Sequence, residues 1–158
     1  MSSSLEPSAC DDRTLTVLLA RAAEPVVVAS HFGGWERPWL ALDADAWREL
    51  ATEFGERVQR VTIETHANRE FALCHGLEIL PEVLVFLRGE VVARFSGRVA
   101  VAELGAAIHG ALRTAHSLAE ATVELEASTR AREGLSTVRS VLRKRTTPLA
   151  ADGLANVG

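Results

Sequence analysis

The sequence has few of the residues that mark several protein classes. Its two cysteines, Cys10 and Cys74, are too few for a disulfide framework, so we expect a reducing, cytoplasmic compartment. Almost all its cations are arginine, Lys144 being the only lysine, which we interpret as coding bias. The net charge of -4 and the absence of a basic stripe with interleaved aromatic residues argue against nucleic acid, so we expect no nucleic-acid partner.

The chain also lacks a long apolar run. The stretch from Leu15 to Ala20 is too short to span a bilayer, and Asp11 and Asp12 precede it where a signal peptide would carry Lys or Arg. We therefore expect no membrane partner. Metal-binding spacing is missing as well, because the candidate ligands His31, His66, Cys74 and His75 do not follow a zinc pattern. We expect neither a metal nor another cofactor.

What the chain does have is the composition of one α/β domain with appendages. It is 47% hydrophobic over 158 residues, enough for a single core. Residues 1–12 mix Ser, Pro and acids and predict a mobile arm, residues 13–115 predict the domain, and residues 116–158 predict a helical extension with a loose tail. In the extension, Gly134 predicts a break in the helix.

Within the domain, apolar periodicity alternates between the helical and the strand type. Helical spacing follows Arg13, extends from Pro38 to Phe54 with Asp43 or Asp45 as an internal cap, and returns at Asn68 to His75 and from Val101 onward. Strand patterns cover 26–29, 58–63, 83–87 and 91–95, the last two joined by a tight turn at Arg88-Gly89-Glu90. This order predicts a mixed sheet with helices on both faces.

Four landmarks between Pro25 and Gly97 resemble thioredoxin. Trp35 and Pro38 of the segment Trp35-Glu36-Arg37-Pro38-Trp39 match the family's Trp-Cys-Gly-Pro-Cys loop, and Leu80-Pro81 matches its cis-proline turn. Phe86 to Val91 match its hairpin, and Gly97 falls at its late glycine. The resemblance implies a thioredoxin-like mixed sheet flanked by helices over residues 13–115, with a cis bond before Pro81.

The departures from this family bear on the chemistry. Dithiol exchange needs two thiols, and Glu36 and Trp39 stand at those positions, so the resemblance implies a redox-inactive member. Ser30 and Thr62 stand where the family keeps a buried Asp and Lys.

The family's peptide-binding geometry needs no thiol. The residue before the cis-proline offers its main chain to an extended peptide, and Leu80 retains that place. Trp35 and Trp39 would supply apolar anchors, and Glu36 and Arg37 polar specificity. The alternative is that both tryptophans only pack the loop.

We therefore expect a binding or assembly factor, chaperone-like, that holds an extended peptide of a client protein. Thioredoxin-like accessory proteins of nickel–iron hydrogenase maturation also lack the Cys-x-x-Cys pair, and the chain resembles that group. The alternative from the enzyme class is a single-thiol oxidoreductase or peroxide-reactive protein using Cys74, although a cysteine on a short helix is more often a small buried hydrophobe.

The extension carries the basic cluster Arg143-Lys144-Arg145 after several glutamates. This cluster could contact acidic protein, phosphate or lipid headgroups, but the preceding glutamates make a solvated amphipathic helix the plainer interpretation. Docking on the domain and pairing with a second copy of the chain as a homodimer are the alternatives.

Overall fold

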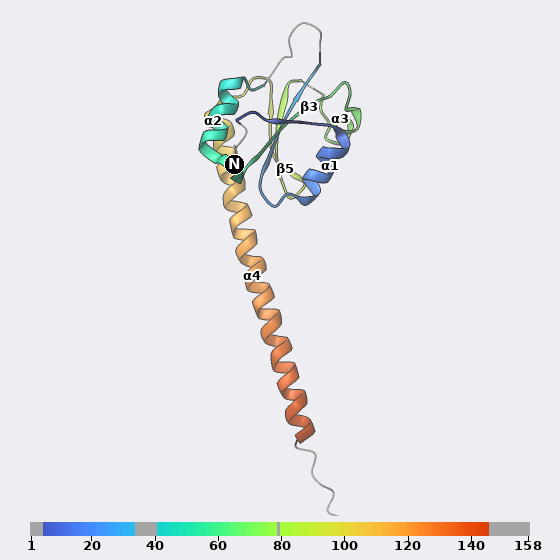
Figure 1. Ribbon diagram of the computed structural model, residues 1–158, viewed down its shortest axis with the longest axis vertical. Coiled ribbons are helices and arrows are strands. Elements are labelled where there is room, and N and C mark those ends of the chain that lie inside the picture. The colour runs from blue at the N-terminus through green and yellow to red at the C-terminus, as the bar shows by residue number, and fades with distance from the viewer. Residues whose placement is uncertain (1–4, 34–40, 79, 146–158) are drawn as a thin grey trace, which may run out of the picture. The chain divides into compact units, whose positions relative to one another are not determined.

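The core of the fold is a five-stranded mixed sheet (Figure 1), seen in a computed structural model that describes residues 5–33, 41–78 and 80–145. The strands are β1 Ser8–Cys10, β2 Val26–His31, β3 Gln59–Glu64, β4 Glu82–Leu87 and β5 Glu90–Ser96. Their order is β1-β3-β2-β4-β5. β1 and β2 lie parallel to β3, whereas β4 is antiparallel to both β2 and β5.

Helices cover both faces of the sheet, as the sequence predicted. α1 (Asp12–Arg21) and α3 (Arg69–Cys74) pack on one face, where Leu15, Leu19 and Phe71 meet the apolar side chains of β2 and β3. On the other face, α2 (Ala44–Phe54) and the first turns of α4 (Val101–Arg145) bury Trp47, Leu50 and Ile108. The two faces are visible on either side of the strands in Figure 1.

Local signals account for several element ends. Asp43 caps α2 by accepting a hydrogen bond from the N–H of Ala46 at 2.9 Å, and Gly55, at a φ of +55°, ends that helix. Arg88 and Gly89 both have positive φ in the two-residue turn between β4 and β5, which suits the twist of a hairpin. Of the segment predicted helical from Pro38, residues 38–40 lie outside the described part, and the described helix begins only after Asp43.

Two sequence-based expectations differ from the structure. Residues 8–10, expected within a mobile arm, form β1 and pair with Val61 to Ile63 at the edge of the sheet. Gly134 does not break the extension, because α4 is continuous from Val101 to Arg145. The helix formers around it outweigh the cost of one glycine. The chain divides into two units, Met1–Ser117 and Leu118–Gly158.

Among the residues that the structure describes, no helix is long and apolar enough to cross a membrane.

Candidate functional site

The loop expected to bind peptide falls outside the described residues. These site residues are Trp35, Glu36, Arg37, Pro38 and Trp39. The structure does describe both flanks of the loop. On one side β2 ends at His31 and leads to Phe32 and Gly33, and on the other Asp43 begins α2.

The carboxylate of Glu64 holds the first of these flanks. Its Oε1 accepts main-chain hydrogen bonds from Gly33 at 3.0 Å and His66 at 2.9 Å, and its Oε2 accepts one from Ala67 at 2.9 Å. A Cβ at position 33 would lie 2.8 Å from the side chain of Glu64, so any other residue there would require that side chain to shift. Burial raises the pKa of Glu64, but the three N–H donors outweigh it and hold that pKa below its usual value.

The Leu80–Pro81 bond is cis, which confirms the prediction from sequence. Pro81 is buried, and its carbonyl accepts a hydrogen bond from the N–H of Gly97 at 2.8 Å. Gly97 has a φ of +80°, a conformation that favours glycine. Leu80 is half-buried, and none of the hydrogen bonds found within the described ranges uses its main-chain N–H or carbonyl. Among the described residues, none therefore occupies its main-chain groups.

An ion pair between a buried carboxylate and a partly exposed arginine lies next to the cis-proline. The side chain of Glu82 is only 3% exposed, and its Oε1 accepts a hydrogen bond from Nη1 of Arg94 at 2.9 Å. Nη2 of Arg94 donates to the carbonyl of His75 at 2.5 Å, and Nη1 also donates to that of Gly76 at 3.4 Å. Arg94 therefore joins β5, β4 and the end of α3. Sequence reasoning did not identify this pair.

A shallow apolar hollow adjoins Leu80. It has a volume of about 380 Å³ and is lined by Phe32, Thr65, His66, Arg69, Ala72, Leu73 and Leu80. Phe32 is 52% exposed and Leu73 is 83% exposed, so two large apolar side chains face solvent here. The sequence signal that could identify this hollow is Phe32, which lies next to the family loop.

The structure does not bring Ser30 and Thr62 together. Ser30 pairs with Ile63, whose side chain packs with α1 and α3. The hydroxyl of Ser30 donates to the carbonyl of Glu82 at 2.8 Å. Thr62 is the neighbour of Ile63 on β3 and pairs with Ala29, whose side chain packs on the opposite face. The only buried carboxylate near Ser30 among the described residues is that of Glu82.

Cys74 is exposed, so the expectation that it is a small buried hydrophobe is wrong. The ring of His75 takes the covered position instead, with its centroid 4.5 Å from that of Phe71 and 5.1 Å from that of Phe86. Burial, and then the charge of Arg94, lower the pKa of His75. Burial, and then the charge of Asp11, raise the pKa of Cys10. Within the described ranges no group of three potential metal ligands occurs.

Comparison with known proteins identifies the family of this chain. The chain is 30% identical over 86 residues to thioredoxin C-2 of Corynebacterium nephridii, covering 54% of this chain and 79% of that protein. The chain belongs to the thioredoxin family. It is also 34% identical over 73 residues to the thioredoxin of Bacillus subtilis (strain 168), covering 46% of this chain and 69% of that protein. No protein-family model matches the sequence.

Solved thioredoxin structures agree on the fold. Chloroplastic thioredoxin z superposes with a TM-score of 0.57 at 18% identity, covering 67% of this chain and 94% of that one. A mutant thioredoxin from Halobacterium salinarum NRC-1 gives a TM-score of 0.56, also at 18% identity, covering 71% of this chain and 96% of that one. At this identity the likeness concerns the fold alone.

Proposed function

We propose that this thioredoxin-family protein is a redox-inactive binding or assembly factor that holds an extended peptide of a client protein. The observation that carries the proposal is the half-buried Leu80, whose main chain is available beside cis-Pro81 and an apolar hollow. A peptide added as a strand would gain main-chain hydrogen bonds at Leu80 and place one apolar side chain in the hollow.

The residues at the family's thiol positions support the inactive part of the proposal. Glu36 and Trp39 cannot form a mixed disulfide, so this loop does not exchange thiols. The narrower form of the proposal places the protein in nickel–iron hydrogenase maturation, with the small subunit or its signal peptide as the client. It rests on the resemblance to accessory proteins that also lack the thiol pair.

The test is capture of client protein from the native host by full-length variants. Phe32→Ser removes an apolar side chain that lines the hollow and is 52% exposed. The matched control is Val92→Ser, which removes a side chain that is 50% exposed and lies near the turn of the β4–β5 hairpin. Phe32→Ser should weaken capture while Val92→Ser should not. Trp39→Ala should weaken capture by about 2 kcal/mol or more, the scale of an interface hot spot. Equal capture by Phe32→Ser and Val92→Ser would overturn the proposed groove.

A second measurement addresses the redox chemistry. The wild-type protein should not reduce insulin disulfides, whereas the family geometry predicts that Glu36→Cys with Trp39→Cys forms a disulfide under mild oxidation. A double variant that stays folded and reduced would count against the alignment of this loop with the family.

The exposure of Cys74 favours one alternative, a single-thiol oxidoreductase. Against it, the neighbouring His75 packs its ring on Phe71 and Phe86, and its pKa is lowered, so the imidazole is neutral at pH 7 and provides no charge to stabilise a thiolate. Fast reaction of Cys74 with a thiol reagent at neutral pH, together with insulin reduction that Cys74→Ser abolishes, would establish the alternative and exclude the binding factor.

A further inference from the structure

The part of α4 between residues 118 and 144 carries its charges in two blocks. Residues 118–129 contain Glu120, Glu124 and Glu126 and no cation, a formal charge of -3. Residues 130–144 contain four arginines and Lys144 against the single acid Glu133, so five cations and one acid give +4. All these residues lie at exposed positions of the helix. The helix thus carries two oppositely charged surfaces, one after the other.

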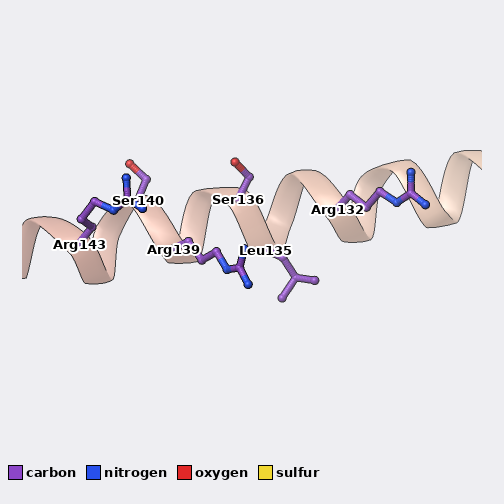
Figure 2. Close-up of a pocket in the computed structure, with 6 residues that line it drawn as sticks. All are labelled: Arg132, Leu135, Ser136, Arg139, Ser140 and Arg143. Atoms are coloured by element: carbon purple, nitrogen blue, oxygen red, sulfur yellow. The ribbon is translucent and has the colours of Figure 1, made fainter.

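An apolar stripe connects the two blocks. It consists of Leu118, Ala121, Leu125, Ser128, Ala131, Leu135, Val138 and Leu142, at successive steps of three or four residues. Leu125 is 69% exposed and Leu135 is 66% exposed, so the stripe faces solvent. Figure 2 shows part of the second block, where Leu135 and Arg139 point to the side of the helix opposite Ser136 and Ser140.

The spacing of this stripe suits a coiled pair of helices. Each step along the stripe is about one turn of the helix, and the seven steps from Leu118 to Leu142 span 24 residues, about 3.4 residues per turn. This repeat is shorter than the 3.6 residues per turn of a straight α-helix, and such a repeat corresponds to a left-handed supercoil. The spacing of the stripe is also nearly the same when it is followed in the opposite chain direction. In an antiparallel pair, Leu118 faces Leu142 and Leu125 faces Leu135 of the other helix, while the acidic block faces the basic block.

We propose that residues 118–144 form an antiparallel two-helix pair with the same segment of a second copy of this chain. A two-fold axis near residue 130 would set each block of -3 against a block of +4, twice in the dimer. A parallel pair would instead set like charges side by side. A lipid surface fits less well, because no aromatic residue follows Phe95, and helices lying in a membrane interface commonly use Trp or Phe on the apolar face.

The experiment measures the mass of the full-length protein by sedimentation velocity over a concentration series. We compare the wild type, Arg132→Glu with Arg139→Glu, Glu124→Lys with Glu126→Lys, and an equimolar mixture of these two double variants. The wild type should dimerise, and each double variant should raise the dissociation constant about tenfold or more. Arg13→Glu with Arg21→Glu is the control, since it makes the same change in net charge on α1 and should leave dimerisation intact.

The direction of the change in each double variant distinguishes the antiparallel arrangement, because in a parallel pair each variant would relieve the repulsion between like blocks and dimerise more tightly than the wild type. The mixture then tests whether the acidic block of one chain faces a basic block of the other. A mixed pair sets the unchanged +4 block of one variant against the unchanged -3 block of the other, so it should dimerise more tightly than either variant alone. Circular dichroism checks that both variants keep the helix. A monomeric wild type, a dimer that both variants leave unchanged, or a mixture no tighter than its components would overturn the proposal. A monomer that binds polyglutamate or phosphatidylglycerol vesicles would overturn it too, in favour of an acidic protein or a lipid partner.

Discussion

Replacing Arg94 by methionine tests whether the ion pair next to the cis-proline holds this part of the fold. Methionine keeps most of the apolar stem of Arg94 and removes the guanidinium. The change leaves the Glu82 carboxylate, 3% exposed, without its cation, and also frees the carbonyls of His75 and Gly76. It acts on a buried charge, so the expected effect is larger than that of an ordinary surface pair.

The structure sets limits on the magnitude. Breaking a buried pair by removing one partner typically costs about 3–5 kcal/mol. Arg94 is 39% exposed, so water already solvates part of the pair in the wild type. We therefore expect Arg94→Met to lower the free energy of unfolding by about 2–4 kcal/mol at pH 7.

Urea unfolding of four proteins gives the measurement. These are the wild type, Arg94→Met, Glu82→Met and the double variant Glu82→Met with Arg94→Met. The double variant should be more stable than Arg94→Met alone, because no buried charge is left without a partner. If Arg94→Met cost less than about 0.5 kcal/mol, the value of a surface pair, Arg94 would not be compensating Glu82.

Two further predictions concern the loop anchor and the extension. The pKa of Glu64 is lowered in the fold, so Glu64 adds stability above its ordinary pKa of about 4.3 and loses it as the pH falls through the lowered value. The difference in unfolding free energy between wild type and Glu64→Gln should therefore shrink from neutral pH to about pH 3, and a constant difference would show that the charge has no part. Gly134→Ala should stabilise α4 by about 1 kcal/mol, because a Cβ there meets nothing within 4 Å, and increased helicity in circular dichroism is the check.

The sheet and its helices were predictable because each buried position is marked by local periodicity. Val27 and Ala29 pack on one face of the sheet and Val26 and Val28 on the other, as a strand covered on both sides requires. The cis bond before Pro81 followed from the family resemblance. β1 was not predictable, since three residues without an apolar pattern form a strand only because β3 offers them an unpaired edge.

The pair of Glu82 and Arg94 was not predictable from the sequence either, because it depends on how two strands align. The register between β4 and β5 shifts at Val85 and Phe86, so counting from the turn at Arg88 and Gly89 misplaces the partners beyond that point. Arg94 stands opposite Leu84 and reaches Glu82 diagonally. The exposure of Cys74 likewise depended on where the ring of His75 packs, which no periodicity on a helix of six residues specifies.

Several hydrogen bonds hold the main chain around the candidate site in place. Glu64 fixes Gly33 on one flank, Gly97 fixes the carbonyl of Pro81, and Arg94 joins Glu82 to the end of α3. None of these contacts involves a thiol, and each restrains main chain that borders Leu80 or leads into the loop at residues 34–40. A groove that positions an extended peptide needs such restraint, because a main chain held in place loses little conformational entropy when a strand is added. In the proposed function, the side chains of disulfide exchange are therefore separable from the main chain that would bind a client, and the sequence replaces the two thiols with Glu36 and Trp39.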